Sequence, residues 1–270
     1  MALLAFFVPL TWACITLAIF SYLIRMFAIT AFYHRYFSHR TFKTSRIVHT
    51  IGAIVASTAG QRGPLWWASH HRRHHRHSDT PNDPHSPTLK GFIWSHMLWF
   101  MAPSAHATVK DEIPDLQKLP ELRLLNRLDW IPVVGLATVC YLLGETAWAA
   151  KYFDATGWQW LIWGFFVPTT ALYHATYTVN SLAHLFGTRR FKTRDGSRNN
   201  LLVALLTLGE GWHNNHHFFP GTARQGFTRW EIDPTFWGLK IMAWLRIVSD
   251  LKPIPEWVQA KAVEHPEETR

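Results

Sequence analysis

The stretch His71-Arg-Arg-His-His75 determines how this chain is organised, and a near copy, His213-Asn-Asn-His-His217, lies toward its other end. Residues three and four apart lie on the same face of a helix, so each stretch would direct three imidazoles toward a common point. A third stretch, His34-Arg-Tyr-Phe-Ser-His39, lies upstream of both. Neutral imidazole is the commonest metal ligand in proteins, and these stretches supply more nitrogens than one tetrahedral zinc ion uses. We therefore predict a dinuclear metal site.

The composition indicates a membrane protein. The 270 residues include 15 Trp, 18 Phe and 17 His, whereas only 17% of the residues are charged. Such a chain has too little polar surface for an ordinary soluble enzyme, and aromatic enrichment is typical of membrane–water interfaces. No linker divides the chain, so we expect a single membrane-embedded domain over residues 1–270.

The positive charge is gathered around the histidine stretches. The net charge is +9 at pH 7, and the basic residues that flank the histidines are Arg35, Arg40, Lys43, Arg46, Arg72, Arg73, Arg76, Arg189, Arg190, Lys192, Arg194 and Arg198. This pattern is typical of cytoplasmic loops of membrane proteins and predicts that the histidines lie on the cytoplasmic side. No nucleic-acid-binding motif competes with this interpretation.

The first apolar stretch is the longest. From Ala2 to Tyr33 the sequence is almost wholly apolar, interrupted only by Pro9 and Arg25. At about 1.5 Å per residue it is too long for one simple crossing of a ~30 Å core and too short for two. We expect a helix from about Leu10 that crosses the bilayer and carries His34 near its cytoplasmic end. Residues before Pro9 would be the stub of a shortened first helix.

Two further stretches, residues 130–148 and 158–179, are long enough to span, and a short polar link joins them on the outside. Residues 47–60 and 92–101 are apolar but too short to cross, so we expect them at or just under the interface. The expected fold is an all-α integral membrane protein. It has three to four transmembrane helices and a cytoplasmic helical cap that holds a histidine-rich di-metal site.

The two cysteines, Cys14 and Cys140, both lie in apolar stretches. That placement argues against a disulfide framework, an iron–sulfur cluster and a thiolate zinc site. His34 and His39 are five residues apart, which separates them by about 140° on a regular helix. They can converge only if the helix ends or bulges between them. Asn180 and His184, four apart, would share a helix face at the end of the last span.

Taken in order, the motifs resemble those of the membrane-bound acyl-CoA desaturases, the stearoyl-type Δ9 fatty acid desaturase family. The resemblance covers the chain from about Leu23 to Pro220. It rests on His34-x4-His39 followed by Arg-Thr-Phe-Lys, on His71-x2-His-His75 with Asp83-Pro-His85, on Asn180-Ser-Leu-Ala-His184, and on Gly209-Glu-Gly-Trp-His213-x2-His-His217 with Pro220. Each motif is weak alone, whereas the set in this order and in these membrane positions is specific.

The resemblance implies a di-iron centre held by nine histidines, with Asn180 linked through a water. The histidines are His34, His39, His71, His74, His75, His184, His213, His216 and His217. Such a centre would use O2 to introduce a cis double bond, at Δ9, into a saturated acyl chain. The chemistry agrees, because no acid–base side chain removes hydrogen from an unactivated methylene pair and a redox metal must do so. An all-nitrogen site can also take zinc in place of iron in a purified sample.

The resemblance also implies a bent, apolar acyl tunnel. Gln61, Trp67 and Thr176 match positions that enclose its bend near the metals, and Tyr22 or Ala18 of the first span would line its blind end. The expected substrate is an acyl-CoA. Basic side chains that hold CoA in the animal enzymes are replaced here by Ser69 and Pro103, which leaves acyl-phospholipid and acyl-carrier-protein as alternatives.

Neither a haem-binding nor a flavin segment is fused to the chain. We therefore expect electrons from a separate donor, either an acidic ferredoxin or a flavoprotein reductase, that binds the basic cytoplasmic face.

Two other functions fit parts of the pattern. A related di-iron membrane hydroxylase or ketolase would use the same metals but place oxygen on its product, and the histidine spacing does not distinguish it. A metal transporter with cytoplasmic histidine loops is the other alternative. Transporters place their ligands near the bilayer midplane, whereas here only His174 falls within a predicted span.

Overall fold

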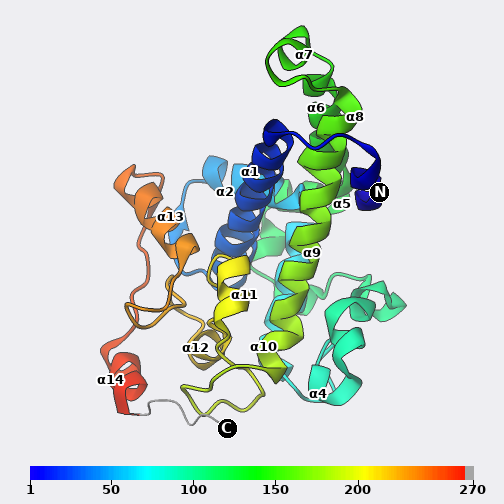
Figure 1. Cartoon of the computed structure of the whole chain (residues 1–270). Helices are drawn as coiled ribbons and strands as arrows, with labels where there is room; N and C mark the ends of the chain where they lie inside the picture. The colour runs from blue at the N-terminus through cyan, green and yellow to red at the C-terminus, as the bar shows by residue number, and fades with distance from the viewer. Residues whose placement is uncertain (265–270) are drawn as a thin grey trace.

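The structure is a computed structural model that describes the backbone of residues 1–264 (Figure 1). This part of the chain is mostly helical, as the sequence predicts. The strands that it contains, β1 (Lys43–Thr44) and β2 (Val248–Ser249), pair with each other in antiparallel fashion. Their pairing joins the segment after the first long helix to the C-terminal part of the chain.

The first long helix consists of two parts. α1 (Trp12–Ala28) passes without a break into the π-helix η2 (Ile29–Ser38), and the Thr11 side chain caps its start by accepting a hydrogen bond from the Cys14 amide. Together they form an apolar helix of 27 residues. At about 1.5 Å per residue this is roughly 40 Å, longer than the ~30 Å hydrocarbon core. The helix can therefore cross a bilayer and still extend beyond it.

The second apolar unit is a helical hairpin beside α1 (Figure 1). α6 (Trp130–Gly144) forms one arm, and α8 (Gly157–Leu161), η8 (Ile162–Phe166) and α9 (Val167–Asn180) follow one another without a break to form the other. α7 (Ala147–Phe153) lies in the turn. A Cβ on Gly144 would lie 2.6 Å from the Thr156 carbonyl oxygen, so glycine is what lets the arms meet. The Ser21 hydroxyl donates to the Gly164 carbonyl at 2.6 Å and holds α1 against the hairpin.

Length and composition identify the candidate membrane-crossing helices. In the described residues one helix, Trp12–Ser38, is long and apolar enough to cross alone. α5 (Pro120–Arg127) and α6 are long and apolar enough only when they are taken together, and the two are bent by 68° relative to each other. The expected count of three to four spans therefore remains a prediction.

The histidines lie in a cap at the lower ends of α1 and α9 (Figure 1). The cap is built on α3 (Pro64–His77), α10 (Leu182–Leu185), α11 (Leu201–Leu206) and α12 (His213–Phe218). α3 packs against η2, and the buried Tyr33 hydroxyl bonds both Ser57 Oγ at 2.7 Å and the Arg62 carbonyl at 3.1 Å. These bonds fix the start of α3 against the first long helix.

Short elements connect these parts. α2 (Arg46–Ser57) is the short apolar helix that the sequence predicts over residues 47–60. The others are η1 (Ala2–Phe7), α4 (Pro87–Lys90), η3 (Trp94–Leu98), η4 (Trp99–Met101), η5 (Pro103–Ala105), η6 (Lys110–Glu112), η7 (Leu116–Lys118), α13 (Pro234–Trp244) and α14 (Glu256–Glu264).

Candidate metal centre and acyl cavity

The π-helix η2 explains how His34 and His39 converge. A π-helix closes its turns between residues five apart, so these two side chains, which diverge on an α-helix, lie on one side. Their ring centroids are 5.0 Å apart. The distortion that the five-residue spacing requires is therefore present, and it takes the form of a π-helix.

Five histidines from three helices form one group, which we call the five-histidine cluster. Its members are His34 and His39 from the end of the first long helix, His71 and His75 from α3, and His216 from α12. One ring nitrogen of each lies within 4.8 Å of those of all the others. The Nε2 atoms of His34 and His216 are 2.9 Å apart, and those of His39 and His71 are 2.8 Å apart.

Four other histidines form the four-histidine cluster: His74 from α3, His184 from α10, and His213 and His217 from α12. The Nε2 atoms of His184 and His213 are 3.0 Å apart. The Nε2 atom of His217 is buried without a hydrogen-bond partner. A polar atom in that position requires a partner such as a metal ion.

The helical spacing distributes the ligands between the two clusters. On α3, His71 and His75 face the five-histidine cluster and His74 faces the other. On α12 the division is reversed, because His216 faces the first cluster while His213 and His217 face the second. Each helix thus serves both clusters, which brings them next to each other.

Carboxylates lie behind four of the nine histidines. The Nδ1 atom of His74 lies 3.1 Å from Asp83, that of His184 3.0 Å from Asp79, and that of His217 2.7 Å from Asp195. Glu210 contacts His34 Nδ1 and also bonds the buried Arg35. Such carboxylates hold Nδ1 protonated and leave the Nε2 lone pair free for a metal.

Sequence reasoning missed this role of the carboxylates. Asp83 and Glu210 enter the sequence analysis only as parts of motifs, and Asp79 and Asp195 are not singled out there. The signal available was their position close to the histidine stretches.

Burial keeps most of these imidazoles neutral. It lowers the pKa of His39, His71, His75, His213 and His216 well below the usual value, and neighbouring histidines add to the effect. Burial lowers the pKa of His217 to about 4 even though Asp195 opposes it. Burial also acts to lower the pKa of His74, but Asp83, Asp79 and Asp195 together outweigh it, so the pKa of His74 is raised. Neutral imidazole is the form that binds metals, so the clusters fit a metal ion each.

The spacing of the nitrogens fits as well. Imidazole nitrogens bind zinc at about 2.0–2.1 Å, so two of them at right angles around one ion lie about 3 Å apart. The close nitrogen pairs in both clusters are 2.8–3.0 Å apart. A third group, His74, Asp83 and His85, shares His74 with the four-histidine cluster. The His85 ring packs against that of His74 with centroids 4.2 Å apart, as expected of a residue that supports a ligand.

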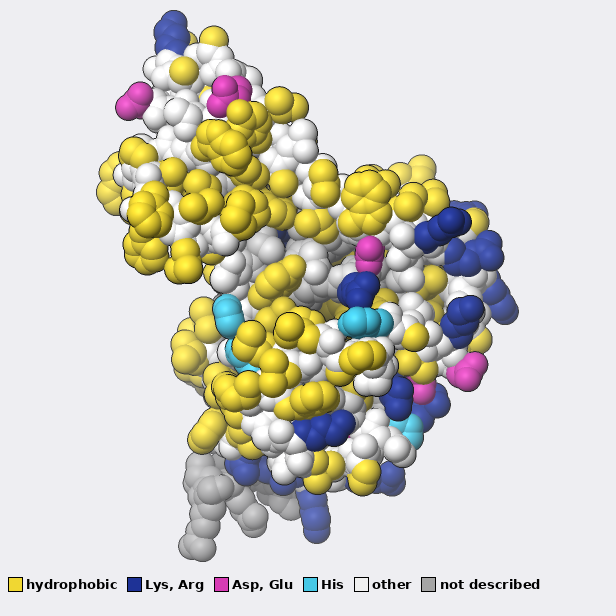
Figure 2. Space-filling model, turned by 90° about the vertical axis from the view of Figure 1, so that its right-hand side faces the viewer, with side chains coloured by type: hydrophobic (Ala, Val, Ile, Leu, Met, Phe, Trp, Pro, Cys, Tyr) yellow, Lys and Arg dark blue, Asp and Glu magenta, His cyan; other side chains and the backbone are white. Residues whose placement is uncertain are grey.

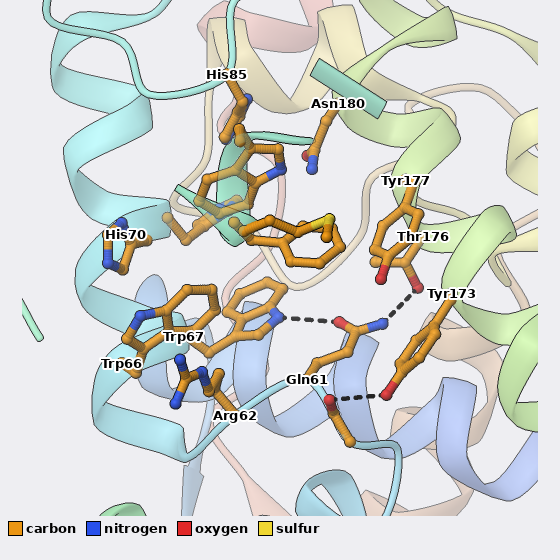
Figure 3. A pocket seen from close by; sticks show the side chains of 15 residues that line it. Gln61, Arg62, Trp66, Trp67, His70, His85, Tyr173, Thr176, Tyr177 and Asn180 are labelled. Atoms are coloured by element: carbon orange, nitrogen blue, oxygen red, sulfur yellow. Dashed lines mark hydrogen bonds between the residues drawn. The ribbon is translucent and has the colours of Figure 1, made fainter. Parts of the chain in front are cut away.

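An apolar cavity of about 310 Å³ adjoins the clusters (Figure 3). Its wall is largely aromatic: Trp66, Trp67, Trp99, Phe100, Tyr173 and Tyr177. The Trp67 indole donates to Gln61 Oε1 at 3.2 Å, and the Gln61 amide donates to Thr176 Oγ1 at 3.0 Å (Figure 3). The three residues predicted to enclose a bend are therefore one hydrogen-bonded chain across the cavity. Figure 2 shows a face of the molecule hollowed between its apolar upper part and the lower part.

A smaller cavity of about 40 Å³ lies between the first long helix and the clusters. It is lined by Met26, Ile29 and Thr30 on one side and by histidines of both clusters on the other. Trp67, His71, Thr176 and Asn180 line both cavities, so the two adjoin at these residues.

The remaining predicted site residues, Asn180, Tyr22 and Ala18, differ in where they lie relative to the two cavities. Asn180, at the end of α9, reaches the cavities beside the metal clusters. Tyr22 and Ala18 line neither cavity, and the Tyr22 hydroxyl donates instead to the Leu206 carbonyl at 2.6 Å. Their role at the end of a tunnel remains a prediction.

The sequence is similar to those of known proteins over most of its length. The model of the fatty acid desaturase family matches residues 10–232. The chain belongs to the fatty acid desaturase family. This membership makes it an oxidoreductase of lipid metabolism, in a family that is membrane-associated and acts on fatty acyl groups.

Individual desaturases are similar over most of their length. An sn-2 palmitoyl-lipid 9-desaturase of Nostoc sp. is 35% identical over 91% of this chain and 84% of its own. An sn-1 stearoyl-lipid 9-desaturase of Synechocystis sp. is 37% identical over 96% of this chain and 78% of its own. An acyl-CoA 5-desaturase of Anemone leveillei is 35% identical over 90% of this chain and 73% of its own.

Proposed function

We propose that this desaturase uses O2 to introduce a cis double bond at Δ9 of a saturated acyl chain. The observation that carries the proposal is the convergence of nine histidines into two adjacent clusters beside an apolar cavity. Two of the similar proteins are named 9-desaturases, which supports the position of the double bond.

Each cluster would hold one iron ion, with Asn180 joining the four-histidine cluster through a water. The irons supply the oxidising chemistry that an unactivated methylene pair needs. The protein's part is to orient the imidazoles through the carboxylates and to keep the acyl chain out of water. In a purified sample zinc can occupy the same nitrogens.

The acyl chain would lie in the larger cavity and bend at the Trp67–Gln61–Thr176 chain. Since the smaller cavity is lined by histidines of both clusters, the methylene pair to be desaturated would lie where the two cavities adjoin. The half-buried hydrogen bonds of Gln61 would fix the wall at this bend and thereby select the carbon positions presented to the metals.

The carrier of the acyl chain is proposed to be a membrane lipid. Among the described residues, Arg62 is the only lysine or arginine that lines the larger cavity, whereas a CoA group carries several phosphates that a cluster of basic residues would neutralise. Ser69 and Pro103 add no charge. Acyl-CoA is the second candidate, supported by the Anemone relative that is named for it.

A separate protein, a ferredoxin or a flavoprotein reductase, would supply the electrons. Exposed Lys192 and Arg194 lie within three residues of Asp195, which holds His217. An acidic donor bound there would be close to the four-histidine cluster. The abundance of Lys and Arg around the histidines supports a cytoplasmic orientation of the whole site. We further propose that residues 1–270 form one domain with α1–η2, α6 and α8–α9 as its spans.

Lipid analysis of a host that expresses the chain tests the proposal. We expect new cis-monoenes with the double bond at Δ9, in membrane lipids before they appear in acyl-CoA, and none in a host that expresses His74→Ala. Hydroxylated or keto products without a monoene would support the hydroxylase instead. Metal flux into vesicles without loss of saturated chains would support the transporter.

A further inference from the structure

The helix α13, which follows the last histidine stretch, has a large apolar face without a partner among the described residues. Trp237, Ile241 and Trp244 are 54, 59 and 80% exposed. They are four and three residues apart, so they share one face of the helix. The opposite face is also apolar, because Leu239 is buried and Met242 packs against the main core. Apart from Lys240, residues 236–244 of α13 are apolar all round. This is typical of a helix in a protein core or a membrane, and α13 has a core on one side only.

The position of α13 in the fold indicates what covers its exposed apolar face. A Cβ on Gly238 would lie 2.4 Å from the Phe27 ring, so α13 crosses the first long helix in close contact at Phe27. One turn earlier on that helix, Leu23 and Ile24 are exposed apolar residues. The exposed face of the membrane-crossing helix thus continues onto α13.

A second short helix lies at the same level. Figure 1 shows α13 beside α1 at the height of α2, well above α12 and α14. α2 packs against α1 and exposes Ile47, Ile51 and Ile54. Strand β1 immediately precedes α2, and strand β2 closely follows α13. Their pairing therefore holds the two helices near each other.

The residues around α13 are those of a membrane interface. Trp230 is exposed, and the Arg229 guanidinium lies 4.7 Å from its ring centroid. Lys240 is exposed on the helix, and Arg246 is exposed just after it. Tryptophan prefers the headgroup level, and basic side chains there reach anionic lipid headgroups.

We propose that α13 is an interfacial membrane helix, whose Trp237–Ile241–Trp244 face lies in the cytoplasmic leaflet. Its N-terminal end is fixed to the metal cap. Asp233 caps it by accepting from the Phe236 amide and also bonds Arg35, while Thr235 Oγ1 lies 2.8 Å from Thr30 Oγ1. The helix therefore connects the cap rigidly to the lipid. This inference does not depend on the identity of the metals or the substrate.

Spin labels on the full chain in lipid nanodiscs test the proposal. A nitroxide is attached at Ile241→Cys in a background where the buried Cys14 and Cys140 are changed to Ala. Phe20→Cys on α1 is the lipid control, and the exposed Lys192→Cys is the water control. We expect the label at Ile241 to collide with O2 more than with a water-soluble nickel chelate, as at Phe20, and the label at Lys192 to show the reverse.

Two results would overturn the proposal. Preferential collision with the nickel chelate at Ile241 would show that the face lies in water. Protection from both reagents, with spin–spin broadening that depends on labelling density, would show that a second copy covers it. Because Ile241 is exposed, its replacement leaves the core intact, and native-like collision rates at Phe20 would verify the fold of the variant.

Discussion

The two histidine clusters contain the same side chain but are supported differently. The five-histidine cluster has more nitrogens, yet in the described part of the chain only its His34 is backed by a carboxylate. In the four-histidine cluster, His74, His184 and His217 are each backed by an aspartate. One cluster therefore has the larger number of ligands, and the other has the larger negative charge around them.

This difference shows two ways to hold a metal. Three aspartates fix the tautomer and orientation of three imidazoles and make them more basic, so fewer ligands suffice. Where aspartates are absent, a fifth imidazole and close packing between η2, α3 and α12 take their place. The aspartates come from loops, Asp79 and Asp83 after α3 and Asp195 after α10, so the four-histidine cluster also depends more on loop structure.

Removing a ligand should have the largest effect. His74→Ala deletes a quarter of the four-histidine cluster and leaves Asp83 buried without its imidazole. We expect desaturation to fall at least about 100-fold, beyond the 10–100-fold effect typical of outer partners. Product analysis in an expressing host measures it, with exposed His106→Ala as the control that keeps activity. Substantial activity in His74→Ala would contradict the division of the ligands into two clusters.

Removing an aspartate should have an intermediate effect. Asp195→Asn keeps the shape but removes the charge behind His217, and we expect affinity for one of the two metal ions to fall about 10–100-fold. Competition with a chelator, followed by metal analysis, measures it. Asp250→Asn, which changes an exposed carboxylate paired with Lys43, is the control. Loss of both ions together would mean that the clusters do not act separately.

The matching substitution in the five-histidine cluster tests the same comparison from the other side. Glu210→Gln removes the charge behind His34, while Arg35 keeps Asp233 as its partner. We expect the affinity of the five-histidine cluster for its metal ion to fall. The fall should be smaller than the one that Asp195→Asn causes in the four-histidine cluster, because four other imidazoles remain. The same competition experiment measures it, and a larger fall than for Asp195→Asn would contradict the account.

The smallest effect on the metals should come from the cavity. Gln61→Leu removes both hydrogen bonds of the Trp67–Gln61–Thr176 chain but touches no ligand. We expect about a tenfold fall in kcat/KM and a mixture of double-bond positions, with two metals retained. Unchanged double-bond position would mean that the chain does not shape the bend.

The clusters were more predictable from sequence than the cavities. Short spacings on a helix carry their own geometry, so His71, His74 and His75 could be placed together from the sequence. The wide turn needed by His34 and His39 was also anticipated, because an i, i+5 pair cannot converge on an α-helix. The aspartates were not anticipated, since a loop carboxylate has no periodicity that marks its partner. The resemblance places Tyr22 at the end of a tunnel; its hydroxyl donates to the Leu206 carbonyl of α11, and its role in a tunnel remains a prediction.

Iron content and its spectroscopic signature test the central claim most directly. The full chain, expressed with 57Fe and shown to be active, should contain two irons per chain in two nitrogen-rich environments by Mössbauer spectroscopy, and His74→Ala should lose at least one. An active preparation with a single iron per chain, or with iron that is not bound by imidazole, would contradict the two-cluster centre.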